Sequence, residues 1–362
     1  MKIFIINEFF PKDKLGGSEL QCFLIAKYLA KLGHEIFYIA LNNIKNKSQY
    51  EKDDGFLVIR LNKKNEFQFL LNKYKPDLCY IRDFGYLYWL LNKIKKFDIR
   101  IVFNISNLND TLRFPEKYHM DFSPKRLLSA TIRNLYHFYN FLALRKVDKI
   151  ISLSYELSEK LKQEGLINTI INDSIEKVVN PPGKFSKPTI IWVANLKSPK
   201  RPELFIELAE ELKDRNVDFL MIGDIREMRY KKIVEKAQER LPNFHYLGFK
   251  PVQETTELIS KSTILVHTCL PEGFGDNFIQ AWMASVPTVT LGFDPDGVIE
   301  RHKLGFYSKK FEQFVKDVDI LLGNEVLRNK MGENARKHFL KNHDIEVNIK
   351  KFEHVFKSLI NQ

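Results

Sequence analysis

Short apolar runs alternate along this chain with longer segments in which apolar residues recur every three or four positions. The first such series is an apolar run at 3–6, a polar loop at 11–17, a helical segment at 18–32 and a second run at 35–41. The helical spacing is carried by Leu20, Phe23, Leu24, Lys27, Tyr28 and Lys31. Gly33 follows this segment, where a left-handed cap is expected. This order predicts a parallel β-α-β unit, because parallel strands need a crossover connection.

The alternation continues through both halves of the chain. Further strand-like runs lie at 75–81, 100–104, 148–153, 189–193, 219–222, 244–247, 263–267 and 288–291, and the stretch 311–360 is helical in pattern. Around 178–184 the periodicity stops, and two prolines with a glycine indicate a stiff connector. We therefore predict an α/β protein with two Rossmann-like, doubly wound parallel-sheet domains that face a cleft. The expected bounds are 1–180, 181–340, and a carboxyl-terminal helix at 341–362 that crosses back to the first domain.

Length and composition agree with two soluble domains. A chain of 362 residues is too long for one ordinary hydrophobic core, and 44% hydrophobic with 28% charged residues is typical of globular proteins. The net charge is +12, and residues 1–180 carry 29 Lys and Arg against 20 Asp and Glu. This excess favours an anionic partner for the first half. The basic residues form no dense block, and no nucleic-acid recognition module is present, so nucleic-acid binding is the weaker alternative.

Cysteine content and hydropathy point to the cytoplasm. Cys22, Cys79 and Cys269 lie far apart and make no CxxC pair, so we expect three buried thiols in a reducing compartment. No run approaches the roughly 20 apolar residues that span a bilayer. The apolar run at the start of the sequence is shorter than a signal-peptide core and is interpreted as a first strand.

Two glycine-containing loops follow predicted strands and precede predicted helices. One holds Gly16 and Gly17; the other holds Gly273 and Gly275. Such a loop offers free backbone N–H groups and the positive end of a helix dipole, which together bind anions. Gly16 and Gly17 lack the GxGxxG spacing of a dinucleotide site, which disfavours a nicotinamide or flavin enzyme. A tight turn that needs a positive φ is the alternative for this pair.

Five motifs in order carry a family resemblance. They are Gly16-Gly17-Ser18-Glu19, Gly33-His34-Glu35-Ile36, Val193-Ala194-Asn195 with Lys200-Arg201-Pro202-Glu203, Leu247-Gly248, and Glu272-Gly273-Phe274-Gly275 through Gln280-Ala281-Trp282. Over essentially its whole length the chain resembles the retaining glycosyltransferases of the GT-B fold, family 4. The resemblance implies a nucleoside diphosphate sugar as the donor substrate, a glycan or lipid-linked hydroxyl acceptor, and no metal or other cofactor. It further implies a role in assembling a cell-surface polysaccharide or lipopolysaccharide.

The resemblance also implies roles for individual residues on the donor side. Glu272 is the expected catalytic residue, which accepts hydrogen bonds from the donor sugar, and Gln280 replaces a second family glutamate that holds the ribose. The donor-binding set is Gly16, Gly17, Asn195, Lys200, Arg201, Gly273, Phe274, Gly275, Asp276, Asn277 and Gln280. Asn195 stands where the family usually has an arginine. Two alternatives remain open: Lys200 and Arg201 as a solvated pair, and Gln280 as part of a capping box that starts at Asn277.

The acceptor side matches the family less well. Family members often have a His-Asp pair after the strand at 100–104, where this chain has Ser106 and Asn107. With Arg82 and Asp83, which follow the strand at 75–81, these form the expected acceptor set, and a structural Arg-Asp pair is the alternative. Retaining members are thought to need no protein nucleophile, since the leaving phosphate helps to deprotonate the acceptor. A catalytically silent sugar-nucleotide-binding protein is the alternative function.

The segment 124–146 is basic and rich in aromatic residues. It holds five Lys and Arg, no Asp or Glu, and a helical pattern that includes Tyr136, Phe138, Tyr139 and Phe141. Such a helix can lie on an anionic membrane surface, at the inner face of the membrane. A domain helix with a solvated basic side is the alternative.

Overall fold

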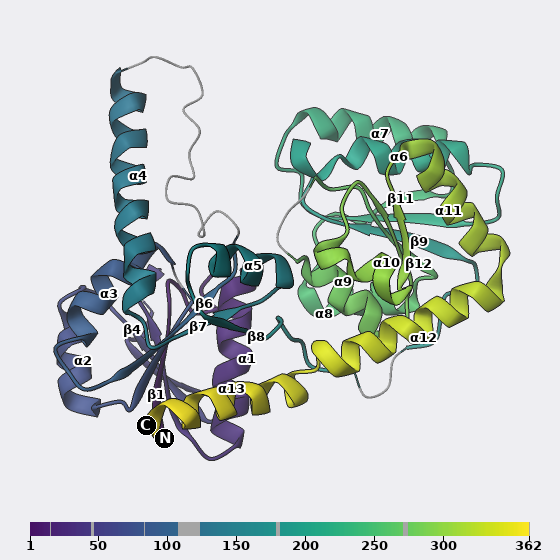
Figure 1. Cartoon of the computed structure of the whole chain (residues 1–362). Helices are drawn as coiled ribbons and strands as arrows, with labels where there is room; N and C mark the ends of the chain where they lie inside the picture. The colour runs from purple at the N-terminus through teal and green to yellow at the C-terminus, as the bar shows by residue number, and fades with distance from the viewer. Residues whose placement is uncertain are drawn as a thin grey trace. The chain divides into compact units, whose positions relative to one another are not determined.

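The computed structural model describes residues 1–14, 16–44, 47–82, 84–107, 124–178, 182–270 and 274–361. The chain forms two compact units, one of Met1–Ile175 with Ile345–Gln362 and one of Glu176–Asp344. Each unit is a β-sheet covered by helices, so the predicted fold class of two Rossmann-like α/β domains is confirmed (Figure 1).

The first unit is built on an eight-stranded sheet with the order β3-β4-β2-β1-β5-β6-β7-β8. Among the strands of the described residues, only the β3–β4 pair is antiparallel. The strands are β1 Lys2–Asn7, β2 Glu35–Ala40, β3 Tyr50–Asp53, β4 Phe56–Arg60, β5 Leu78–Ile81, β6 Arg100–Ile105, β7 Lys149–Ser152 and β8 Asn168–Ile170. Strand order reverses between β1 and β5, and ligands of open α/β sheets bind at the carboxyl ends of strands at such a point.

Helices cover both faces of this sheet. They are α1 Gly17–Lys31, α2 Glu66–Tyr74, η2 Phe84–Tyr86, α3 Leu87–Ile94, α4 Pro124–Ala143, η4 Leu144–Lys146, α5 Tyr155–Gln163 and α13 Ile345–Ile360. One core cluster joins α1 and α13 to alternate residues of the strands, and the other joins α2, α3, α5 and the end of α4 to the remaining ones. The amino-terminal half of α4 projects beyond the sheet (Figure 1).

The second unit has a six-stranded, wholly parallel sheet with the order β11-β10-β9-β12-β13-β14. Its strands are β9 Thr189–Val193, β10 Asp218–Ile222, β11 Phe244–Tyr246, β12 Ile264–His267, β13 Thr288–Leu291 and β14 Gly305–Ser308. Its helices are η5 Ser198–Lys200, α6 Pro202–Glu211, α7 Arg229–Arg240, α8 Val252–Lys261, α9 Asp276–Met283, η6 Pro295–Gly297, α10 Val298–His302, α11 Phe311–Gly323 and α12 Glu325–Asn342. Strand order reverses between β9 and β12.

The two faces of the second sheet are covered by different helices. Helices α6, α7 and α11 pack with Ile190 and Trp192 of β9 and with Ile264 and Val266 of β12. Strand residues alternate between faces, so His267 lies on the opposite face. There its ring contacts Phe278 of α9, with ring centroids 4.6 Å apart. Helix α9 therefore packs on this opposite face of the sheet, at the point where the strand order of the sheet reverses.

Cysteine burial and helix hydropathy bear on two further expectations. The thiols of Cys22, Cys79 and Cys269 are all buried, as predicted. Burial also raises the pKa of Cys79 well above its ordinary value. Within the described ranges, no helix combines the length and the hydropathy needed to cross a membrane.

Candidate functional site

The amino terminus of α9 lies at the reversal point of the second sheet. Gly275 caps the helix with a φ of +84°, a left-handed value that favours glycine, and no side chain caps it. Asn277 Nδ2 donates to the Val193 carbonyl at 2.6 Å, which ties the first turn of α9 to the end of β9. Phe274 is buried and Asp276 lies in the first turn. The backbone N–H groups of this turn therefore face the edge of the sheet where a ligand is expected.

Two predicted residues of this loop, Glu272 and Gly273, lie outside the described residues, as does Asp83 of the acceptor set. Their predicted roles remain predictions.

Lys200 and Arg201 lie beside the end of β12. Thr268 follows β12, and its Oγ1 donates to the Lys200 carbonyl at 2.8 Å and accepts from Trp192 Nε1 at 2.9 Å. The half-buried Lys200 is thereby held at the carboxyl edge of the sheet. Arg201 donates to the carbonyls of Thr268 and Leu291, the latter at 2.7 Å. Through these bonds the Arg201 guanidinium links the ends of β12 and β13. Lys200 differs, because it is its backbone carbonyl that contacts Thr268.

Asn195 is exposed at the end of β9. Its Oδ1 accepts a hydrogen bond from the Asp224 backbone N–H at 3.3 Å. The segment after β10 approaches so closely that a Cβ on Gly223 would lie 1.8 Å from the Ala194 carbonyl oxygen. Asn195 therefore joins the ends of β9 and β10 through a neutral contact.

Gln280 is buried on α9 and does not act as a cap. Its Nε2 donates to Thr256 Oγ1 of α8 at 3.0 Å, and its Oε1 has no partner among the described residues. The helix is capped at Gly275 and not at Asn277, so the capping-box alternative is wrong. The side chain that is predicted to bind the ribose is thus a buried amide, and a residue of the neighbouring helix α8 orients it.

In the first unit, Gly16 and Gly17 begin α1 at the reversal point between β1 and β5. Gly16 has an extended φ of −148°, and neither glycine has a positive φ, so the tight-turn alternative is wrong. A Cβ on Gly16 would lie 2.3 Å from Glu19 Oε2, the end of a flexible side chain that would have to move aside. Burial raises the pKa of this Glu19 carboxyl.

Arg82 follows β5 but is enclosed. It is 5% exposed, and its Nη2 lies 2.7 Å from Asp173 Oδ2. Although burial opposes its charge, Asp173 and Tyr80 raise its pKa above the ordinary value. Arg82 therefore forms a buried ion pair with a partner 91 positions away, whereas the alternative supposed a pair with its neighbour Asp83. Ser106 is half-buried and Asn107 exposed, both after β6.

A buried ion-pair network that the sequence analysis missed holds the loop before Gly16. Arg60, at the end of β4, contacts Asp13 with Nε at 2.5 Å and Nη2 at 3.3 Å, and Glu51 at 2.7 Å. Lys47 Nζ lies 2.7 Å from Asp13 Oδ1. The side chains of Asp13 and Arg60 are both fully buried. In the sequence, the feature that could have indicated this network is Asp13, an acidic residue in a loop whose other charged residues are lysines.

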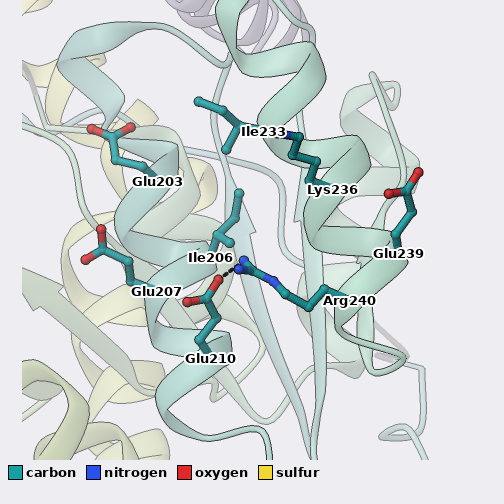
Figure 2. A pocket seen from close by; sticks show the side chains of 8 residues that line it. All are labelled: Glu203, Ile206, Glu207, Glu210, Ile233, Lys236, Glu239 and Arg240. Carbon is teal, nitrogen blue, oxygen red and sulfur yellow. Dashed lines mark hydrogen bonds and ion pairs between the residues drawn. The ribbon is translucent and has the colours of Figure 1, made fainter.

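A groove between α6 and α7 contains none of the predicted residues (Figure 2). It has a volume of about 580 Å³ and is lined mainly by charged side chains: Glu203, Ile206, Glu207, Glu210, Ile233, Lys236, Glu239 and Arg240. Burial and the neighbouring glutamates raise the pKa of Glu207. This acidic character disfavours a diphosphate. In the described part of the chain, no group of three or more His, Cys, Asp or Glu is arranged to hold a metal.

Residues 174–338 match the family model of Glycosyl transferases group 1, and this match supports a glycosyltransferase domain of the GT-B type in this part of the chain. A relative from Staphylococcus aureus, poly(ribitol-phosphate) alpha-N-acetylglucosaminyltransferase, is 25% identical over 207 residues. The match covers 55% of this chain and 41% of the relative, so the chain spans less than half of that protein.

Two solved structures resemble nearly the whole chain. Sucrose-phosphate synthase from Thermosynechococcus elongatus has a TM-score of 0.75 at 14% identity and covers 100% of this chain and 99% of its own. Anabaena HepE in complex with UDP-glucose has a TM-score of 0.71 at 17% identity, and the match covers 99% of this chain and 100% of HepE. At these identities the likeness shows the fold.

Proposed function

We propose that this protein is a retaining glycosyltransferase of family 4 that moves a sugar from a nucleoside diphosphate sugar to a hydroxyl acceptor. The observations that carry the proposal are the α9 amino terminus and Lys200 at the carboxyl edge of the second sheet, and the buried Gln280 amide further along α9, all inside the part that matches the family. The UDP-glucose complex of the Anabaena protein supports a UDP-sugar class of donor. The Staphylococcus aureus relative supports a cell-surface glycan as the acceptor.

Each element of this edge has a part in donor binding. The N–H groups after Gly275 and the helix dipole attract the diphosphate, and the Lys200 ammonium adds a positive charge without a metal. Arg201 contributes through its fixed backbone, because its guanidinium is bonded to carbonyls. Glu272 binds the sugar hydroxyls and Gln280 the ribose. In this proposal the leaving phosphate takes part in deprotonating the acceptor, and no metal is required.

Donor titration tests the proposal. Isothermal titration of UDP, GDP, ADP and CDP should find one that binds, and Lys200→Ala should weaken that affinity by roughly 1.5–3 kcal/mol, the range for a hydrogen bond to a charged group. Lys197→Ala, in the same loop, is the matched control and should leave the affinity unchanged. An unaltered dissociation constant in Lys200→Ala removes this lysine from the site.

Product analysis separates the enzyme from the silent alternative. With the matching nucleoside diphosphate sugar, the enzyme should slowly hydrolyse the donor or glycosylate an added acceptor, in the presence of a chelator, and NMR should show a retained anomeric configuration. Binding without any turnover would support the silent sugar-nucleotide-binding protein instead.

We also propose that α4 contacts an anionic membrane surface. Its described part exposes large apolar side chains, namely Ile132, Leu135, Tyr136, Tyr139 and Leu142. Residues 122–147 contain five cations and no acid, a charge that matches anionic lipid. The full-length protein should sediment with anionic vesicles and not with zwitterionic ones, and Leu135→Glu should reduce this binding. Equal binding of the variant would refute the contact.

A further inference from the structure

Gln280 has only part of its hydrogen-bonding capacity met by the protein. The residue is 6% exposed, and its Nε2 is paired with Thr256 while Oε1 has no partner among the described residues. Buried polar atoms are nearly always paired, so an unpartnered oxygen on the helix whose amino terminus is proposed to bind the donor calls for a hydrogen-bond donor from outside the protein. A hydroxyl group of a ligand is such a donor.

Thr256 determines which end of the amide faces the site. Its Oγ1 lies 2.8 Å from the Val252 carbonyl, to which it donates its only hydrogen. Towards Gln280 the same oxygen can therefore only accept. This requires the NH2 end of the amide to face α8 and leaves the oxygen on the other side. A carboxylate at position 280 would place acceptor against acceptor unless Thr256 released Val252.

We infer that Thr256 is a positioning residue, which holds the Gln280 amide so that Oε1 accepts a hydrogen bond from a ribose hydroxyl of the donor. The inference rests on the proposed function. Gln280 and Thr256 form a matched pair: the amide supplies a donor to the threonine and an acceptor to the ligand. A glutamine thereby offers the nucleotide the same kind of group, an oxygen acceptor, that the family's glutamate offers.

The test compares two ligands that differ only in the ribose hydroxyls. The probe is whichever of UDP, GDP, ADP and CDP binds the wild type most tightly, measured beside its 2′,3′-dideoxy counterpart by isothermal titration. We expect the wild type to prefer the ribonucleotide by about 3- to 10-fold, the contribution of one hydrogen bond. Thr256→Val should reduce this preference below about twofold, with the dideoxy affinity unchanged. Thr256→Ser keeps the hydroxyl and should keep the preference.

Each outcome decides between the hypotheses. Equal affinity of the wild type for both ligands, or a full preference in Thr256→Val, overturns the positioning role while nucleotide binding and the proposed function stand. No binding of any of the four nucleotides overturns both. A ratio of two affinities is insensitive to a general loss of stability, and Thr256→Ala provides the same comparison if the valine variant does not fold.

Discussion

Replacing Asp13 by Asn tests whether charge holds the loop that leads into α1. The Asp13 and Arg60 side chains are both fully buried, with Arg60 Nε 2.5 Å from Asp13 Oδ2. Asn keeps the shape but removes the negative charge, which leaves Arg60 with Glu51 as its remaining acid. Removing one member of a buried ion pair costs roughly 3–5 kcal/mol, and we expect about 3 kcal/mol because Glu51 still neutralises part of the charge.

The effect should depend on pH in a defined direction. Burial alone would raise the pKa of Asp13, but hydrogen bonds to Arg60 and Lys47 outweigh it and lower the pKa below 3.8. A carboxyl whose pKa is lowered on folding stabilises the protein above its unfolded pKa, and this stabilisation is lost as the pH falls through the folded pKa. The difference between wild type and Asp13→Asn should therefore be equal at pH 7 and pH 5 and smaller at pH 3.

Urea-induced unfolding at these three pH values, followed by circular dichroism, measures the difference. Glu159→Gln is the control, because it removes an exposed ion pair with Lys162 in the same unit and should cost at most about 1 kcal/mol. A cost below about 1 kcal/mol for Asp13→Asn at pH 7 would refute the reasoning, as would a difference that does not shrink at pH 3.

Three further changes test other parts of the molecule. Burial and two neighbouring histidines lower the pKa of His338 to about 3. The contribution of this residue to the free energy of unfolding is therefore complete above pH 6.5 and falls by about 1.4 kcal/mol per pH unit below it. His338→Gln should flatten this decline between pH 6.5 and 5 in urea unfolding, and an identical slope would contradict the assignment. Glu272→Gln should slow sugar transfer more than it weakens nucleoside diphosphate binding, and lost binding with normal transfer per bound donor would reverse the assignment. Gly223→Ala should destabilise the fold by more than about 2 kcal/mol, because its φ is +147° and a Cβ would overlap the Ala194 carbonyl; Gly183→Ala, with open space around it, should be neutral.

The order of strands and helices could be predicted because buried parallel strands are short apolar runs separated by helical periodicity. Four strands were missed, β3, β4, β8 and β14, and two of them show the physical reason. β4, Phe56–Arg60, is joined by a tight turn to the charged strand β3, and β14, Gly305–Ser308, is too short and polar to stand out. In both cases tertiary pairing in the sheet overrides a weak local signal.

The helical spacing identified the buried face of α1 only in part. Of the apolar residues at that spacing, Leu20, Phe23, Leu24 and Tyr28, the structure buries Leu24, and the other buried residues of the helix are Gln21, Cys22, Ile25, Ala26 and Leu29. The reason is α13, which comes from the other end of the chain and packs with α1 in one core cluster. A contact made across more than 300 positions leaves no trace in local periodicity.

The same limit applies to the candidate site. Glycine loops and Lys200 could be found from motifs, because backbone approach to an anion needs particular residue types next to strand ends. The partners of Arg82 and Gln280 could not, since Asp173 and Thr256 come from other elements. Motifs indicate which residues meet a ligand, and only the fold indicates what orients them.

The return of α13 to the first sheet has a consequence for biosynthesis. Phe352 and Phe356 pack against Tyr80, with ring centroids 5.8 and 5.9 Å apart, so one face of this sheet has only α1 as cover until residues 345–360 have left the ribosome. The second unit is continuous in sequence and has all of its elements before that moment. The second unit can therefore finish folding before the first, and a released chain that ends at residue 344 should hold a completed second unit and a first unit that proteases can still cut.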